Sequence, residues 1–332
     1  MLRQILAASL LALACVSPGR AEQTDVKVSK GFGILYLPLM VVEDQKLFEK
    51  HAKRLGAGDL HVTWLTIDGG TAINDAMISG NLQYAGIGIP GFVTLWSKGK
   101  GTPREAIGVS GLSRSALLLN TRNPSVKSLK DFGPNDRIAL PGIKTSLSAL
   151  ILEMGAAKEF GDANYAKLDA LTVALGHPDA YAALISGKGE IDAHFGSPPY
   201  SNLELETAGI HTVFNSTSVL GDSSVDVVYS TRAFADANPK VTQALVDALD
   251  EANAYIRRNK RGAAEAYLRV SQTKTTLDEI LRMLDDPDTA FSTTPRGSML
   301  FANFMAKAGI ITAKPASWKD LFVPYVQRRK GS

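Results

Sequence analysis

Residues 76–90 read Ala-Met-Ile-Ser-Gly-Asn-Leu-Gln-Tyr-Ala-Gly-Ile-Gly-Ile-Pro, and residues 183–198 read Ala-Leu-Ile-Ser-Gly-Lys-Gly-Glu-Ile-Asp-Ala-His-Phe-Gly-Ser-Pro. Each stretch predicts a helix that ends at a glycine (Gly80, Gly187), then a short apolar strand, then a turn of small residues. Glycine adopts the left-handed conformation that ends many helices. Two such units predict two α/β lobes of similar build, with a ligand held between the strand ends of both.

Strand and helix patterns alternate around both copies. The predicted strands are 26–32, 60–67, 83–87, 106–112, 116–120, 137–140, 171–175, 191–195, 209–214 and 225–230, and the helices are 38–53, 70–79, 90–98, 145–158 and 179–186. After residue 231 we expect helices only, the first of them long and beginning at Asn238-Pro239. Such alternation predicts an α/β fold with mainly parallel sheets.

Residues 1–21 have the pattern of a secretory signal peptide. Arg3 precedes an apolar stretch at 5–16, helix-breaking residues follow, and we expect cleavage after Ala21. Lipidation at Cys15, the single cysteine, is the weaker alternative, because Ala rather than Leu stands three residues before it. The mature protein is therefore expected in the periplasm, without disulfides or thiol chemistry.

Charge and hydropathy exclude two classes of protein. The chain has 36 Lys and Arg against 33 Asp and Glu, a net charge of +3. Cleavage would remove two arginines and no acid, leaving +1. A nearly neutral chain without a basic stripe is not typical of nucleic-acid binding. No later apolar stretch approaches the roughly 20 residues of a membrane-spanning helix.

Most tests for catalytic or metal chemistry are negative. The histidines show no metal-ligand spacing; they are His51, His61, His177, His194 and His211. His194 is the one candidate among them for a ligand contact, but a half-buried histidine in a strand is more often structural. Residues 108–112 lack the last glycine of a nucleophile elbow. Residues 86–91 match G-x-G-x-x-G, but Pro90 removes a phosphate-binding donor and the match follows the third strand, not the first. We expect no metal, cofactor or catalytic residue.

Four turns instead link strand ends to helix starts. They are Asp68-Gly-Gly-Thr71, Gly88-Ile-Pro90, Pro141-Gly-Ile-Lys-Thr-Ser146 and Gly196-Ser-Pro-Pro199. Helix N-termini present unpaired N–H groups and partial positive charge, and small residues let a polar ligand approach. Ordinary N-capping by Thr and Ser is the alternative explanation. We expect the polar head of a ligand between Gly70-Thr71 and Thr145-Ser146.

Four segments of the chain are similar to a known protein family. They are 33–50, with Tyr36-Leu-Pro and Glu43-Asp-Gln-Lys-Leu-Phe-Glu-Lys; 64–98; 137–146; and 180–200, with Ile191-Asp-Ala. These segments resemble the periplasmic substrate-binding proteins of ABC transporters. The branch is that of nitrate, sulfonate and taurine binders, which also contains binders of thiamine-pyrimidine precursors. The similarity extends to about residue 232 and more loosely beyond.

The resemblance implies the bilobed periplasmic-binding-protein fold (type II), with two mainly parallel sheets flanked by helices and a helical C-terminal segment. Lobe 1 would comprise 22–113 and 222–332, lobe 2 would comprise 114–221, and two crossing strands would join them. The lobes would close over a small molecule and pass it to a membrane permease with its ATPase. The implied ligand-binding residues are Phe32, Gly33, Tyr36, Gly70, Thr71, Ile89, Pro90, Thr145, Ser146, Ser197 and Pro198, with Asp222 and Ser223 near the return crossing.

The ligand is less determined by the sequence than the fold. The four turns contain no arginine, Lys144 is their one basic residue, and Arg114 at the crossover is within possible reach of the cleft. A sulfonate, taurine or similar organic anion is the first expectation. A pyrimidine-like or aromatic solute stacked on Phe32 or Tyr36 is the second. Nitrate would leave these aromatic residues without a role.

Other classes of protein share this bilobed fold. Menaquinone-pathway enzymes and thiamine-pathway pyrimidine synthases do, but the signal peptide and the lack of a cysteine-rich iron-binding run argue against both. A periplasmic subunit that feeds a sensor stays open as a third reading.

Overall fold

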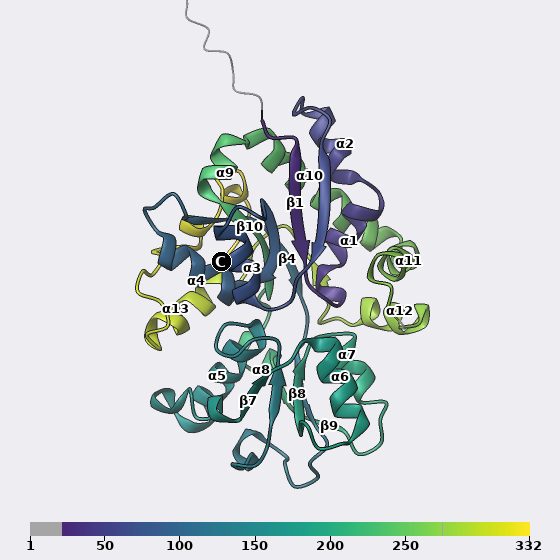
Figure 1. The fold of residues 1–332 in the computed structure, drawn as a ribbon, viewed down its shortest axis with the longest axis vertical. Helices are drawn as coiled ribbons and strands as arrows, with labels where there is room; N and C mark the ends of the chain where they lie inside the picture. Colours follow the sequence, from purple (N-terminus) through teal and green to yellow (C-terminus); the bar gives the residue numbers. More distant parts are fainter. Residues whose placement is uncertain (1–21, 274) are drawn as a thin grey trace, which may run out of the picture.

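The computed structural model describes residues 22–273 and 275–332, so the predicted signal peptide lies outside the described residues. Figure 1 shows two lobes, each a sheet with helices on both sides. The predicted α/β bilobed architecture is confirmed. The boundaries at 113/114 and 221/222 stay our proposed division.

The first sheet has six strands in the order β11-β4-β10-β3-β1-β2. Its strands are β1 (Asp25–Lys30), β2 (His61–Thr66), β3 (Tyr84–Gly88), β4 (Ala106–Arg114), β10 (Asp226–Thr231) and β11 (Ala290–Phe291). The second sheet has five strands in the order β7-β6-β8-β5-β9. They are β5 (Leu118–Thr121), β6 (Ile138–Leu140), β7 (Thr172–Ala174), β8 (Ala193–Gly196) and β9 (His211–Asn215).

Both sheets are mixed, which corrects the expectation of mainly parallel sheets. β1 runs parallel to β2 and β3, and β6 runs parallel to β7 and β8. The strands next to the two crossings break this pattern: β10 is antiparallel to β3 and β4, and β5 is antiparallel to β8 and β9. Strand β11 also corrects the prediction that strands stop after residue 231, because it pairs with the end of β4.

Helices cover both faces of each sheet. In lobe 1 they are α1 (Leu37–Asp44), α2 (Leu47–Arg54), α3 (Gly70–Ile78), α4 (Ile89–Gly99), α9 (Arg232–Ala237), α10 (Pro239–Arg258), α11 (Lys260–Ser271), α12 (Leu277–Asp285) and α13 (Ser298–Lys307). In lobe 2 they are α5 (Leu147–Phe160), α6 (His177–Ser186), α7 (Tyr200–Glu204) and α8 (Thr217–Leu220). The single helix predicted over 38–53 is two helices, because Lys46 takes a left-handed conformation (φ 51°) between α1 and α2.

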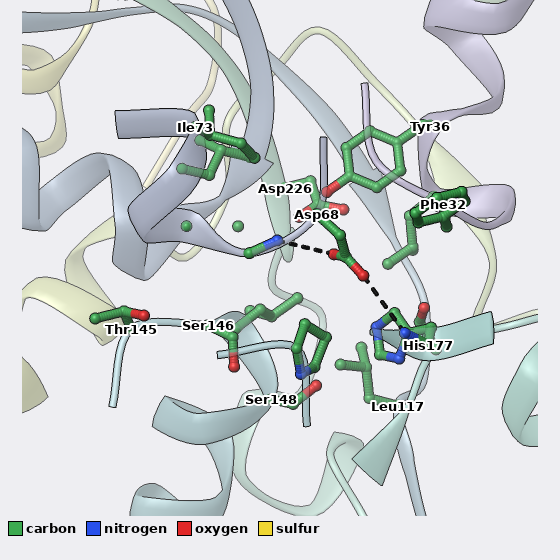
Figure 2. Close-up of a pocket in the computed structure, with 18 residues that line it drawn as sticks. Phe32, Tyr36, Asp68, Ile73, Leu117, Thr145, Ser146, Ser148, His177 and Asp226 are labelled. Carbon is green, nitrogen blue, oxygen red and sulfur yellow. Dashed lines mark hydrogen bonds between the residues drawn. The ribbon is translucent and has the colours of Figure 1, made fainter. Parts of the chain in front are cut away.

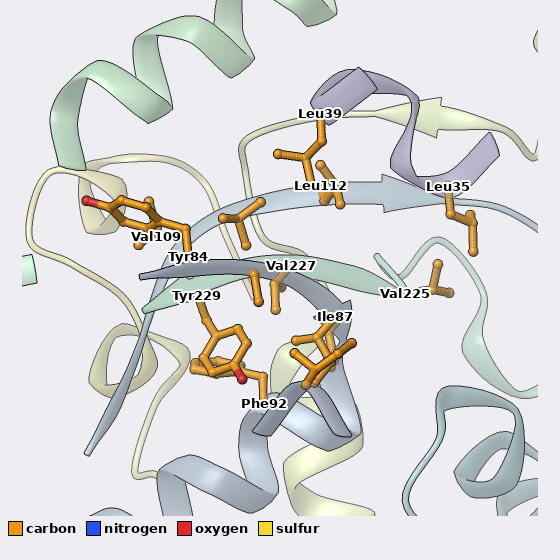
Figure 3. Packing of buried hydrophobic residues seen from close by; sticks show 14 of the residues in the cluster. Leu35, Leu39, Tyr84, Ile87, Phe92, Val109, Leu112, Val225, Val227 and Tyr229 are labelled. Atoms are coloured by element: carbon orange, nitrogen blue, oxygen red, sulfur yellow. The ribbon is translucent and has the colours of Figure 1, made fainter. Parts of the chain in front are cut away.

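The core of lobe 1 is built around β4 and β10. Figure 3 shows Val109 of β4 and Val227 and Tyr229 of β10 packed between helices, and all three are fully buried. Phe92 of α4 contacts the Tyr229 ring at 5.8 Å between centroids. Strands buried on both faces have near-continuous apolar sequences, which agrees with the apolar run that predicted a strand at 106–112.

The two lobes touch across the cleft through backbone and side-chain hydrogen bonds. Ile34 N donates to the Pro198 carbonyl at 3.1 Å, and Thr71 Oγ1 donates to Thr145 Oγ1 at 3.1 Å. A Cβ added at Gly70 would lie 2.9 Å from the Thr145 carbonyl oxygen, closer than real Cβ atoms approach. The absence of a side chain at Gly70 therefore permits this closed arrangement.

Gly70→Ala should shift the protein towards an open form. Gly70 begins α3, where alanine is about 1 kcal/mol more favourable than glycine, so lobe 1 itself should not be weakened. The new methyl group would collide only across the cleft. We expect small-angle scattering to give a larger radius of gyration for Gly70→Ala than for the parent. Gly133→Ala is the control, because its Cβ would meet nothing closer than 3.8 Å. An unchanged radius for Gly70→Ala would contradict this account of closure.

Candidate functional site

A small cavity of about 50 Å³ lies between the lobes, where β2, β3 and β6 end and helices begin. Both lobes contribute to its wall, as Figure 2 shows. The lining residues are Phe32, Leu35, Tyr36, Asp68, Gly69, Gly70, Ile73, Ile87, Gly88, Leu117, Pro141, Thr145, Ser146, Leu147, Ser148, His177, Ser197 and Asp226. Within the described part of the chain, the lining contains two carboxylates and neither lysine nor arginine.

Asp68 binds the N-terminal ends of helices from both lobes. Its Oδ1 accepts from the N–H of Gly69, which precedes α3, at 3.0 Å. Its Oδ2 accepts from the N–H of His177, the first residue of α6, at 3.4 Å. Figure 2 marks both hydrogen bonds. Burial raises the pKa of this carboxyl, and the two N–H donors lower it in part. Asp68 thus occupies the anion position at these helix ends.

Asp226 is the second carboxyl group of the cavity. It is the first residue of β10 and is 1% exposed, and Ser113 Oγ donates to its Oδ2 at 3.3 Å. Burial, followed by the nearby charge of Asp68, raises the pKa of Asp226 to about 7. The same two carboxyls act on Tyr36, whose hydroxyl pKa is raised well above 10, mainly by burial.

His177 connects the cavity to a buried cluster of polar side chains in lobe 2. Its Nδ1 lies 2.9 Å from His194 Nε2, and His194 Nδ1 hydrogen-bonds Glu204 Oε1. His194 and Glu204 are both fully buried. The expectation of a half-buried His194 is therefore wrong: its strand, β8, lies between β6 and β5 and its ring faces α7. Burial, with His194 as a second cause, holds the pKa of the His177 imidazole well below its ordinary value.

Apolar side chains form the rest of the wall. Leu35, Ile73 and Ile87 come from lobe 1, and Leu117 and Leu147 from lobe 2. Phe32 lies at the cavity and is 36% exposed. The cavity therefore suits a compact solute with an apolar or aromatic body and hydrogen-bond donors at its polar edge.

The structure brings six of the sequence-predicted residues to the cavity, namely Phe32, Tyr36, Gly70, Thr145, Ser146 and Ser197. Others lie at its edges and take part in packing or inter-lobe contacts; these are Gly33, Thr71, Ile89, Pro90 and Pro198. Ser146 is the N-cap of α5, and its hydroxyl accepts from the N–H of Ala149, so the capping explanation holds there.

Asp222, Ser223 and Arg114 lie away from the cavity, at the links between the lobes. Arg114 hydrogen-bonds Asp222 and the carbonyl of Pro287, and Arg296 donates to Asp222 at 3.0 Å. Ser223 lines a separate small hollow with Arg114. Lys144 is exposed, outside the cavity lining.

Sequence reasoning missed the two carboxyl groups and the imidazole of the cavity. Asp68 was part of a turn singled out for its glycines, and its own carboxylate was not considered. Asp226 starts a strand that was read as a crossing only. His177 precedes a proline at the start of a helix, and no spacing rule connects it with His194. Pairing of distant segments brings these residues together.

Metal binding and membrane insertion find no support in residues 22–273 and 275–332. No cluster of three or more His, Cys, Asp and Glu residues there is arranged to hold a metal ion. None of the helices described has both the length and the apolar character to cross a bilayer.

Three solved structures share the fold. The alkanesulfonate-binding protein SsuA of Xanthomonas axonopodis pv. citri, bound to MOPS, is 18% identical with a TM-score of 0.69 over 88% of this chain and 96% of its own. The periplasmic aliphatic sulphonate-binding protein SsuA of Escherichia coli is 16% identical with a TM-score of 0.66, over 93% and 100%. The periplasmic nitrate-binding protein NrtA of Synechocystis PCC 6803 is 14% identical with a TM-score of 0.70, over 92% and 85%.

At these identities the likeness shows the fold, here that of periplasmic binding proteins, and not the ligand. Among proteins of curated function, no sequence matches this chain. The model of the NMT1-like family does match, over residues 19–270 of the 332. A match over most of the length shows that the chain belongs to the NMT1-like family.

Proposed function

We propose that this protein is the periplasmic solute-binding component of an ABC importer, which captures a small solute between its lobes and delivers it to a permease and its ATPase. The observation that carries the proposal is the cavity between the lobes, whose wall both lobes share. Membership of the NMT1-like family and the fold of the sulfonate- and nitrate-binding proteins support it. Export by the predicted signal peptide would place the protein in the periplasm.

We further propose a solute that donates hydrogen bonds, such as an aminopyrimidine or another flat ring with amino or amidinium groups. An anionic head would lie beside Asp68 and Asp226 with no lysine or arginine among the described lining residues. Like charges about 4 Å apart repel by about 4 kcal/mol at the effective dielectric constant near a protein surface. Moreover, Asp68 already accepts the N–H groups at the starts of α3 and α6 that an anion would use.

A sulfonate or taurine remains the competing solute, and two features support it. The N-cap of α5, Ser146, lines the cavity, and the hydroxyls of Thr71 and Thr145 meet at its edge. Calorimetry with 4-aminopyrimidine, benzamidine, taurine and nitrate separates the proposals. We expect binding of the first two only. Binding of taurine alone would overturn the donor-bearing solute while leaving the importer proposal in place.

A binder should release its solute unchanged. Among the described cavity residues, no hydroxyl is hydrogen-bonded to the imidazole of His177. We propose that the protein performs no chemistry on the solute. Mass spectrometry after long incubation with a bound probe should recover that probe intact, and conversion would favour the enzyme alternative.

Asp226→Asn should weaken binding of benzamidine by about tenfold or more. A hydrogen bond to a charged group contributes about 1.5–3 kcal/mol, and the amide cannot replace the carboxylate as a charged acceptor. Asp236→Asn, an exposed carboxyl on α9, is the matched control and should bind like the parent. Equal affinities for both variants and the parent would remove Asp226 from the site.

Affinity for benzamidine should rise with pH. Asp226, with its pKa raised to about 7, holds a proton below that pH and must lose it to pair with an amidinium. The dissociation constant should therefore fall from about pH 6 to about pH 8 and then level off. Calorimetry across this range tests the sign. In Asp226→Asn the dependence should be much smaller, and an affinity that falls with rising pH would contradict the assignment.

A further inference from the structure

A fully buried chain of hydrogen bonds runs from β5 to the cavity through Asn120, Glu204, His194 and His177. Asn120 Nδ2 lies 2.8 Å from Glu204 Oε2, Glu204 Oε1 hydrogen-bonds His194 Nδ1, and His194 Nε2 lies 2.9 Å from His177 Nδ1. Asn120, His194 and Glu204 are all 0% exposed. Buried polar groups are costly unless satisfied, so each link must have a defined donor and acceptor.

The far end of the chain fixes the direction of its first bond. Asn120 Nδ2 lies 2.7 Å from the carbonyl oxygen of Ser201, which can only accept, so the amide nitrogen faces it. The same nitrogen donates its second hydrogen to Glu204 Oε2. Asn120 Oδ1 accepts from Thr212 Oγ1 at 2.7 Å, which satisfies the other side of the amide. Asn120 is thus held as a donor to Glu204.

The donor and the acceptor can then be assigned in the next two hydrogen bonds, from Glu204 to His194 and from His194 to His177. We take Glu204 as a carboxylate, which only accepts, so that His194 carries a proton on Nδ1. We also take His194 as a neutral imidazole, which has one N–H, so that its Nε2 is an acceptor. His177 Nδ1 must then be the donor in the next bond, and His177 Nε2 is left with a lone pair.

His177 Nε2 is the ring nitrogen available to the cavity. His177 lines the cavity, its ring stacks on Tyr200 at 6.0 Å, and no hydrogen bond to Nε2 is made by any described residue. The titratable groups around it are Asp68, Asp226 and Tyr36 from lobe 1, and Tyr200, His194 and Glu204 from lobe 2. The lowered pKa of His177 keeps its ring neutral near pH 7.

We infer that Glu204, acting through His194, fixes the proton of His177 on Nδ1, so that His177 Nε2 accepts a hydrogen bond from an N–H or O–H group of the solute. Glu204 and His194 are positioning residues, and His177 is the specificity-determining contact. The solute part of the inference rests on the proposed function, whereas the proton position is a property of the protein alone.

Glu204→Gln should reverse the whole chain without changing its shape. Asn120 donates, so the glutamine must turn its carbonyl oxygen to Asn120 and its NH₂ group to His194. His194 Nδ1 then accepts, His194 Nε2 donates, and His177 Nδ1 accepts. The proton of His177 moves to Nε2, and the cavity faces a donor instead of an acceptor.

Nitrogen-15 NMR of histidine-labelled protein without solute reads the proton position directly. We expect His177 protonated on Nδ1 in the parent and on Nε2 in Glu204→Gln, with the signal assigned by its loss in His177→Gln. Glu190→Gln, an exposed carboxamide substitution in the same lobe, should match the parent. A parent protonated on Nε2, or a Glu204→Gln spectrum equal to that of the parent, would overturn the inference. If Glu204→Gln does not fold, the parent spectrum decides.

Binding of 4-aminopyrimidine tests the solute contact. Loss of one hydrogen bond, with two donors left facing each other, should weaken binding by about tenfold in Glu204→Gln and not in Glu190→Gln. Equal affinity despite a moved proton would overturn the contact with the solute. A parent that binds no aminopyrimidine while showing the expected proton on Nδ1 would refute the proposed solute and leave the buried chain in place.

Discussion

The closed structure depends on the approach of two backbones at the cleft. The N–H of Ile34 reaches the carbonyl of Pro198 at 3.1 Å, and Asp68 of one lobe accepts the N–H of His177 from the other. Contacts this short leave no space for side chains at Gly70 or Gly88, where an added Cβ would lie 2.9 and 2.8 Å from lobe 2 atoms. Both lobes contribute to the cavity wall in this arrangement. On the proposed function, a bound solute would favour this closed form.

The cavity also contains buried acidic groups. Burial raises the pKa of the carboxyl groups of both Asp68 and Asp226. Asp68 is compensated by two backbone N–H groups, but Asp226 has Ser113 Oγ as its one hydrogen-bond donor among the described residues. An acceptor this poorly satisfied in a closed cavity favours a partner that brings donors with it. A donor-bearing solute would supply them and stabilise the closed form.

The sequence predicted the fold better than the site, for a physical reason. The paired glycine-ended helices at residues 76–90 and 183–198 are local patterns, and local patterns determine strands, helices and turns. The cavity, by contrast, combines Asp68, His177 and Asp226 from three distant segments. Sheet order and the crossing between lobes decide that combination, and neither follows from spacing along the chain. The sequence therefore indicated which turns line the cleft and left the sign of its charge undetermined.

The sign of the charge in the cleft decides whether an anion or a donor-bearing solute fits the proposed site. A helix N-terminus offers about half a positive charge, and its effect fades within the first turn. The starts of α3 and α6 already face the carboxylate of Asp68, whose full negative charge exceeds what one such terminus supplies. Asp226 adds negative charge above its pKa of about 7. In an uncharged cleft, the N-terminal ends of α3 and α6 would be free to bind an anionic solute. Here their N–H groups already donate to the carboxylate of Asp68. The shared fold alone therefore does not assign the ligand of the sulfonate- and nitrate-binding proteins to this chain, and the proposed donor-bearing solute rests on these two carboxyl groups.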